Sequence, residues 1–537
     1  MNSQFDKPRM RACFAAALAA PVVAIALLAG DARAADAATH EAPSAQAPSA
    51  PTDVEVTSDT AAQFYDVRSP TGETVLSRRR LTTTLGAAVY NLLGAPEGDP
   101  KAPELNFRVR LRYDADFGAD GATTDQTNSG AFVPGFSQSL LDLMYAYVEG
   151  RRLLHGWLGF RLGRQYVTDA LGWWSFDGGE VSLVTPYYLK AEVYGGLEQR
   201  GGFPLSTPRF ESDGIWRGSR SGFDPLLYPQ FQPANIAPAF GVAIESAGFT
   251  WLHGRLTYRQ VYDTGSANVS DFASATPGVY SASRISSERL GYAFEANLGK
   301  AAGAKAGIVY DLYREEMTSL YGSVDAYLGK SVTLSADYDY YVPVFDGDSI
   351  WNFFAGEPMN DVGLRANVEV NDRLSIAGGG HLRIFTVQTA PLDPLGGNTS
   401  FAYMPYPNYQ AKLDYFPTNG QPFDEGANVS ARWRTGETTV GFRGAGNWGD
   451  EGDRVGADVS AQHVFETRYV ASARTGLWQW EDKLRPDRST TSFNYVLGLG
   501  YRFAPRAQAM IEWEHDMNGL VGQRFRLMLW LTLAVTK

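Results

Sequence analysis

Apolar and polar residues alternate strictly along the C-terminal stretch of the chain. From Phe525 to Val535, every second side chain is apolar. Successive side chains of a β-strand point to opposite faces, so this run predicts a strand with one face that is apolar from end to end. The run is long enough for a tilted strand to cross the hydrocarbon core of a membrane.

The same alternation recurs from about Leu105 onward. Apolar or aromatic residues occupy every second position from Leu105 to Tyr113, and Asn106, Arg108, Arg110 and Arg112 occupy the positions between them. Strands of a membrane β-barrel have this pattern, with lipid outside and a polar interior. A soluble β-sandwich also alternates, so strand length, strand number and cellular location must decide between the two.

Residues 1–34 have the features of a secretory signal peptide. Three basic residues precede an apolar core that extends to Leu28, and Ala32 and Ala34 provide a small-x-small cleavage site. The one cysteine, Cys13, lies inside this segment, so we expect a mature chain without disulfides. These features predict export and favour the membrane barrel.

Composition supports the same class. The chain has 13% aromatic residues, 56 glycines and only 20% charged residues, which fits many strands joined by tight turns. No apolar stretch of about 18 residues follows the signal peptide, which excludes helical membrane spans and leaves a barrel in contact with outer-membrane lipid. The net charge of −12, without a basic cluster, argues against nucleic acid as a partner.

We therefore predict an all-β fold, a transmembrane antiparallel β-barrel with an even strand number of about 18–20. Residues 1–34 are assigned to the signal peptide, 35–77 to a disordered periplasmic leader and 78–537 to the barrel. The leader is rich in Ala, Pro, Ser, Thr and Glu from Asp36 to about Gln63, a composition that cannot bury enough apolar surface to fold. About twenty strands are counted from Leu105 to Val535. The stretch Arg78-Leu93 alternates weakly, and adding it alone makes the total odd.

Short and long connections alternate along the predicted barrel. Outer-membrane barrels keep short turns on the periplasmic side and long loops outside. Short connections are expected near Gly150-Arg152, Thr185-Pro186, Gly299-Gly303, Gly329-Lys330, Asn371-Asp372, Thr435-Glu437, Glu466-Thr467 and Ala504-Arg506. Long ones are expected near 117–138, 165–178, 198–238, 264–283, 345–358, 389–425 and 482–491.

The predicted inward positions carry rows of charge in which arginine dominates. An arginine excess in a confined interior favours anionic solutes, although such charges also pair with one another for structural reasons. The candidate pore-lining residues are Arg108, Arg110, Arg112, Arg161, Arg164, Gln165, Asp177, Lys190, Glu192, Arg255, Arg259, Arg365, Arg432, Arg434, Glu512, Glu514, Arg524 and Arg526. Arg443, Arg474 and Arg502 belong to the same rows.

Aromatic clusters mark the predicted outer loops, at Trp173-Trp174, Trp216, 351–354 and 403–409. Aromatic faces can bind sugar rings, but they also anchor loops and sit at membrane interfaces. Catalytic signals are missing from the sequence: the histidines are scattered singly, with no nucleophile and base at suggestive spacing and no paired metal ligands. We expect neither enzymatic activity nor a cofactor nor a bound metal.

The segment Phe160-Gln165, followed by Phe176-Asp177-Gly178 and the strand Glu180-Thr185, resembles the GRQ…FDG strand-loop-strand of alginate-export-like and porin-like outer-membrane barrels. This resemblance implies an 18-stranded barrel with an arginine-rich lumen that passes an acidic polysaccharide outward. The matching positions are Arg161, Arg164, Gln165 and Asp177. The chain also resembles the barrel subunits of polysaccharide-export pathways, which implies a periplasmic polysaccharide-export protein as a partner, recruited by the leader.

The resulting prediction is a channel in the bacterial outer membrane, most consistent with export of a polysaccharide. Two alternatives remain open at this point. One is a general porin for polar solutes, which usually forms trimers, and the other is an adhesin or structural barrel that transports nothing.

Overall fold

The structure is a computed structural model that describes residues 52–94, 102–116, 141–199, 237–263, 284–312, 315–342, 358–385, 423–449, 452–483 and 486–536. Within these residues the chain forms one antiparallel sheet of 22 strands. No helix in the described part is both long and apolar enough to cross a membrane.

The strands follow one another along the chain and each pairs with the next. Their bounds are β1 (Asp53–Arg68), β2 (Thr74–Tyr90), β3 (Glu104–Asp116), β4 (Leu141–Arg152), β5 (Leu158–Asp169), β6 (Gly172–Val184), β7 (Leu189–Glu198), β8 (Pro238–Ser246), β9 (Leu252–Asp263), β10 (Arg284–Asn297), β11 (Ala302–Asp311), β12 (Glu316–Leu328), β13 (Val332–Tyr341), β14 (Met359–Asn371), β15 (Leu374–Phe385), β16 (Phe423–Thr435), β17 (Thr438–Gly449), β18 (Gly452–Phe465), β19 (Tyr469–Asp482), β20 (Thr490–Ala504), β21 (Ala507–Asn518) and β22 (Gly522–Thr536). Two short helical turns, α2 (Leu153–Gly156) and η4 (Pro486–Arg488), lie between strands.

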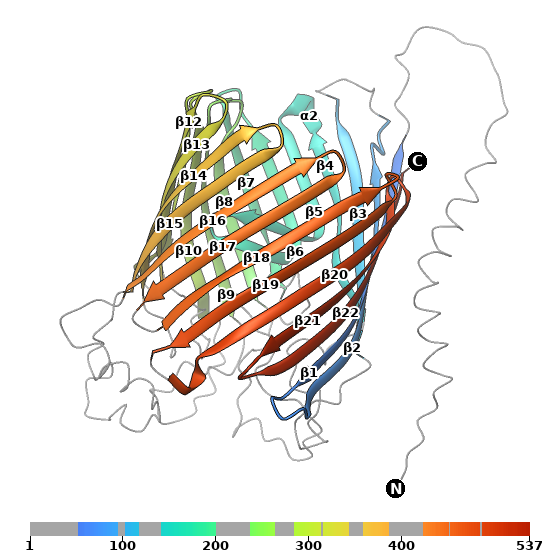
Figure 1. The fold of residues 1–537 in the computed structure, drawn as a ribbon. Coiled ribbons are helices and arrows are strands. Elements are labelled where there is room, and N and C mark those ends of the chain that lie inside the picture. The colour runs from blue at the N-terminus through green and yellow to red at the C-terminus, as the bar shows by residue number, and fades with distance from the viewer. Residues whose placement is uncertain are drawn as a thin grey trace, which may run out of the picture.

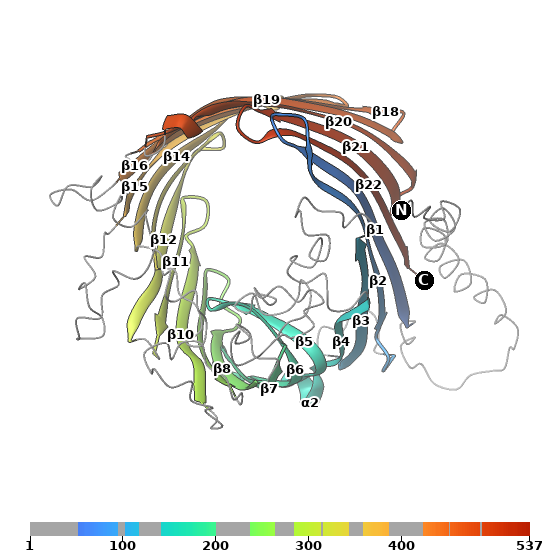
Figure 2. The same ribbon diagram turned by 90° about the horizontal axis from the view of Figure 1, so that it is seen from below.

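The first and last strands close the sheet into a ring. β1 pairs with β2 on one side and with β22 on the other, in a continuous register from Glu55 opposite Thr536 to Arg68 opposite Gln523. Seen along the barrel axis, the strands form a ring (Figure 2). The predicted fold class, a closed all-β antiparallel barrel with an even number of strands, is confirmed.

Two details of that prediction are wrong. The strand number is 22 rather than 18–20, and residues 53–77 belong to β1, β2 and their turn rather than to a disordered leader. The count of about twenty from residue 105 onward corresponds to β3–β22. β1 escaped notice because Ser58, Thr60 and Ala62 occupy the face on which other strands carry large apolar residues, so its alternation is weak. Arg78-Leu93 is thus mostly β2, and β1 restores the even number.

The connections divide the barrel into two unlike ends. α2, the start of β1, the end of β22 and short turns such as 372–373 and 436–437 lie at one end, uppermost in Figure 1. The chain joins strands across the long stretches 199–237 and 386–422 at the other end. All eight predicted short connections fall within a few residues of turns at the first end. The predicted loop 165–178 is instead a tight hairpin of β5 and β6. The predicted connection 482–491 joins β19 and β20 through η4, and the other predicted long connections lie mostly outside the described residues.

The two faces of the sheet differ as the alternation predicts. Large apolar side chains such as Leu162, Leu364 and Leu499 lie on one face and are 63%, 66% and 64% exposed. The register places charged and small residues on the other face, which points into the barrel. The outer face is therefore apolar and the inner face polar.

Candidate functional site

The outer part of the β5–β6 hairpin leaves the wall, turns inward and lies against the inner face of β7–β9. Pairing of β4 with β5 stops at Ala146 opposite Arg164, and yet the tip of the hairpin contacts Arg259 of β9 and Gly291 of β10. Neighbouring strands are about 4.8 Å apart, so β6 and β10 are separated by about 19 Å along the wall. Only a ribbon that turns inward beneath β7–β9 spans that distance (Figure 2). We call Gln165–Phe176 the inward hairpin.

Glycines make the bend at the base of the inward hairpin possible. Gly163, Gly178 and Gly196 lie opposite one another on β5, β6 and β7. Gly163 has a φ of +129°, and a Cβ at Gly163 or Gly178 would lie only 2.2 or 2.1 Å from a backbone carbonyl oxygen. Larger residues would push the strands apart. Gln165 secures the bend because its Nε2 donates to the carbonyl oxygen of Gly178 at 3.0 Å.

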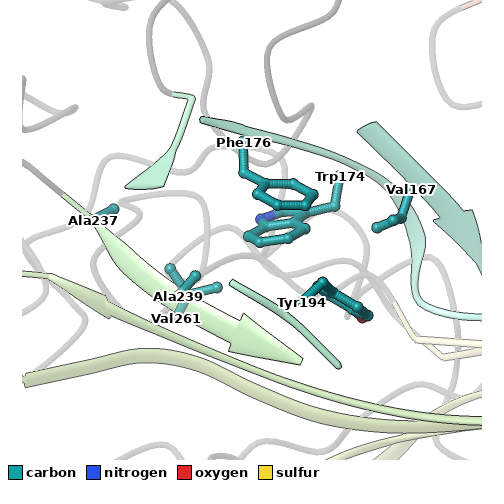
Figure 3. Close-up of a cluster of buried hydrophobic side chains, with 7 residues drawn as sticks. All are labelled: Val167, Trp174, Phe176, Tyr194, Ala237, Ala239 and Val261. Atoms are coloured by element: carbon teal, nitrogen blue, oxygen red, sulfur yellow. The ribbon is translucent and has the colours of Figure 1, made fainter. Parts of the chain in front are cut away.

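An aromatic core fills the space between the inward hairpin and the wall (Figure 3). The rings of Trp174 and Phe176 stack at 4.2 Å, both are fully buried, and Tyr194 of β7 packs against them. Ala239 and Val261, from β8 and β9, complete the cluster. The Trp174 indole donates to Glu198 at 2.7 Å, which satisfies its polar atom. The hairpin is therefore a packed element of the fold.

A buried ion pair holds the tip of the inward hairpin. Asp169 accepts a hydrogen bond from Arg259 of β9 at 2.8 Å, and the Arg259 guanidinium also lies 5.0 Å from the centre of the Trp174 ring. The second carboxylate oxygen of Asp169 accepts the backbone N–H of Leu171 at 2.9 Å. Both oxygens of the carboxylate are thus engaged.

The GRQ…FDG residues brace this hairpin. Arg164 and Asp177 form a two-pronged ion pair at 2.7 and 2.8 Å, and Arg164 also donates to the carbonyl oxygen of Leu143 at 3.0 Å. The register places both side chains on the face opposite Gln165 and Phe176. On that face, Tyr166 stacks on Trp173 at 4.2 Å. The motif thus supports a bend between strands, which sequence reasoning had treated as a pore-lining feature followed by a loop.

The remaining candidate residues lie on the inner face of the strands by register. These are Arg108, Arg110, Arg112, Arg161, Gln165, Lys190, Glu192, Arg255, Arg259, Arg365, Arg432, Arg434, Glu512, Glu514, Arg524 and Arg526. They divide into a group with carboxylate partners and a group without.

Most cations on the wall made by β3–β9 have carboxylate partners, and we call it the paired wall. Arg110 reaches Asp59 at 2.6 Å, and Arg255 bridges Glu192 and Glu245 at 2.5 and 2.7 Å. Further ion pairs join Arg161 with Glu149 and Glu180, and Lys190 with Glu192. Beside β1, Arg524 and Arg526 both contact Glu514. Charge on this side is largely neutralised.

The opposite wall presents arginines without such partners. Its members are exposed, and within the described part of the chain their side chains form neither a hydrogen bond nor an ion pair. We call this set the arginine wall: Arg365, Arg432, Arg434, Arg443, Arg474 and Arg502, on β14, β16, β17, β19 and β20. β16 lies eleven strands from β5, half of the 22-strand circuit, so the arginine wall and the inward hairpin lie on opposite sides of the barrel.

The register explains why these arginines stay free. Gly441 and Thr439 lie opposite Arg432 and Arg434. Asp458 lies opposite Arg443, but its Oδ1 accepts the indole N–H of Trp478 at 3.3 Å instead. Within the described residues these guanidinium groups therefore form no ion pair with a carboxylate.

Sequence reasoning missed Asp169 and Tyr194 among the residues that position the hairpin, and it placed Trp174 in an outer loop rather than in the core beneath the hairpin. A signal was present, because Gln165, Val167 and Asp169 continue the alternation of β5. Of the predicted aromatic loop clusters, Trp173-Trp174 lies in β6, and Trp216, 351–354 and 403–409 lie outside the described residues. No group of potential metal ligands occurs within the described ranges.

No protein-family model and no curated protein matches the chain. Among solved structures, the chain is similar to OccAB4 of Acinetobacter baumannii, with a TM-score of 0.41 and 7% identity over 91% of this chain and 99% of that one. It is also similar to the outer membrane protein OpdK of Pseudomonas aeruginosa, with a TM-score of 0.40 and 8% identity over 90% and 99%. A structure of OpdK with vanillate gives 0.37 and 8% over the same shares. At this level of likeness, function has to be inferred from the geometry of the chain itself.

Proposed function

We propose that the protein is an outer-membrane porin that passes small polar solutes, with a preference for anions, and that it catalyses no reaction. The observation that carries this proposal is that a closed barrel has exposed arginines on one side of its interior and the inward hairpin on the opposite side. Solutes that cross the interior would pass between the two.

The outer surface supports a place in a membrane. A closed ring leaves no strand edge unpaired, which is the condition for β-structure in lipid. Aromatic residues gather on the outer face near the short-turn end, among them Tyr188, Phe249, Trp251, Tyr469 and Tyr501. Such residues favour the interface between lipid and water. Short turns at this end assign it to the periplasm.

The charge distribution supports anion preference. Fixed positive charges that are neither buried nor paired raise the local concentration of anions in a confined, water-filled interior. The inward hairpin supports a size limit, because it occupies part of the cross-section that the 22 strands enclose.

Export of a polysaccharide, which the sequence resemblance implied, is less well supported. A folded hairpin that occupies part of the interior hinders the passage of a polymer more than the passage of a small solute. The leader proposed to recruit a periplasmic export protein is also shorter than predicted, because residues 53–77 belong to β1, β2 and their turn. Deleting residues Asp36-Gln63 would remove most of β1, the strand that closes the ring, so we expect this deletion to prevent barrel assembly.

Replacing Arg432, Arg434 and Arg443 together by glutamine tests the proposal. We expect the reversal potential in planar bilayers under a salt gradient to shift toward cations, most strongly at low salt, where screening is weak. As a control, Lys300 and Lys330, which lie in the turns before β11 and β13, are replaced by glutamine and compared with the Arg432→Gln/Arg434→Gln double variant, which removes the same charge. Equal shifts in both variants, or cation preference in the unmodified protein, would contradict anion selection by the arginine wall.

A further inference from the structure

We infer that Asp169 and Arg259 are positioning residues that set the bore of the channel. Their ion pair, which we call the latch, keeps the inward hairpin folded into the barrel interior against β7–β9. This inference rests on the proposed function, because a bore matters only in a channel. It concerns the hairpin, whereas ion preference concerns the arginine wall.

Backbone hydrogen bonds to the neighbouring strands β4 and β7 do not hold the middle of the inward hairpin. β4 follows β5 only as far as Arg164, and the pairing of β6 with β7 ends at Phe176 opposite Glu198, with one more bond from the Gln199 N–H to the Ser175 carbonyl. Within the described part of the chain, the backbone of residues 166–174 therefore pairs only with itself. A two-stranded ribbon is marginally stable in water, so its position depends on side-chain attachments.

The latch lies close to the tip of the hairpin, far from the hinge. The Asp169 side chain is fully buried and that of Arg259 is 7% exposed, so neither charge is solvated when the other is removed. Because an unpaired buried charge is unfavourable, loss of either partner should drive the tip out of its place rather than leave it there. The Trp174–Phe176 core would remain nearer the hinge.

The wall is shaped to receive the tip. Gly291 of β10 faces Ala170 and Leu171, and a Cβ at Gly291 would lie 3.1 Å from the Ala170 Cβ and 2.7 Å from Leu171 Cδ2. Glycine at this position therefore leaves the recess in which the tip sits. The recess and the ion pair lie on different strands, β10 and β9, and both fix the same end of the hairpin.

A disulfide provides a direct test of this geometry. Cys13, within the predicted signal peptide, is the one cysteine of the chain. The double variant Ala170→Cys/Gly291→Cys thus adds the two thiols of an otherwise cysteine-free mature barrel. Their Cβ atoms approach closely enough for a disulfide with a small adjustment, since disulfides need about 3.5–4.5 Å. We expect it to form on mild oxidation of the folded protein in detergent, detected by loss of free thiol and by altered mobility on non-reducing gels.

Function is then measured on the latch variants Asp169→Asn and Arg259→Gln. We expect a larger single-channel conductance and entry of larger neutral sugars in liposome swelling, whereas the control Asp372→Asn, in a periplasmic turn, should behave as the unmodified protein. Adding the Ala170/Gly291 disulfide to Asp169→Asn should return the conductance to that of the unmodified channel, and reduction should abolish this rescue.

Two results would overturn the latch. One is an unchanged bore in both latch variants, and the other is failure of the disulfide to form in the otherwise unmodified barrel. If the unmodified protein does not conduct at all, the proposed porin function fails and the bore inference fails with it. Efficient cross-linking would then show a hairpin fixed for a purely structural purpose.

Discussion

The paired wall and the arginine wall use the same residue in opposite ways. On β3–β9, Arg110 and Arg255 meet carboxylates within 2.7 Å, and the carboxylates come from neighbouring strands or from β1. On β14–β20, Arg432 and Arg434 face glycine and threonine across the ladder and remain exposed. An inward arginine therefore has no fixed role in a barrel. The residues opposite it in the register decide whether it braces the wall or faces the solute.

The two walls also differ in what lies over them. The inward hairpin covers part of β7–β9 and buries Arg259 under Trp174. No described residue covers Arg432, Arg434 or Arg443, which remain exposed. Burial and pairing occur together, as expected if charges are removed from water only when a partner compensates the loss of solvation.

The largest expected effect tests whether the inner and outer faces are assigned correctly, since both walls depend on that assignment. Leu529→Arg places a charge on the lipid-facing side of β22 and should cost about 2–4 kcal/mol, whereas Met528→Arg on the inner face should cost much less. Urea titrations of the barrel folded into lipid vesicles measure both. Equal costs would mean that the register of the two faces is wrong.

A second, smaller effect separates the walls by stability. Arg255→Met leaves Glu192 and Glu245 without a partner that bridges them, so we expect a loss of about 1–3 kcal/mol in the free energy of unfolding. Arg432→Met breaks no ion pair and should change stability by no more than about 0.5 kcal/mol. The same vesicle titrations apply. A cost for Arg432→Met as large as that for Arg255→Met would show that the arginine wall is also structural.

The smallest expected effect is a difference in ion selectivity between variants of the two walls. Replacing Arg108, Arg110 and Arg112 together by glutamine removes three charges from the paired wall, and we expect a weaker shift in reversal potential than for the Arg432/Arg434/Arg443 variant. The partner carboxylates already cancel much of the field on that side. Planar-bilayer recordings at one low salt concentration compare the two variants, and a stronger shift from the paired wall would reverse the assignment.

The fold was largely predictable from the alternation of residue types. Strands from β3 to β22 carry apolar side chains at every second position, and short turns such as 436–437 interrupt them at regular intervals. β1 was not predictable in this way, because small residues such as Ser58 and Thr60 on its outer face hide the period. Its place depends on pairing with β22, at the far end of the chain, which no local pattern reveals.

For the candidate site, the sequence predicted which charged residues lie on the inner face but not which of them form ion pairs. The alternation placed Arg255 and Arg432 on the inner face, but it could not distinguish them, because their partners lie on other strands. The bend at Gly163 was also beyond the pattern. The strand period continues unchanged through Val167 and Asp169 while the ribbon turns away from the wall, so the direction of the hairpin depends on distant contacts with Arg259 and Gly291.

The seam between β1 and β22 determines the order in which the molecule can be built. Its partners are separated by nearly the whole chain, so closure must wait until the last strand has been synthesised and exported. Until then both edges of a growing sheet offer unpaired backbone groups to any other strand nearby. The ring that protects the finished protein is therefore absent throughout its assembly, and the period of greatest risk for aggregation ends only when residues 522–536 meet residues 53–68.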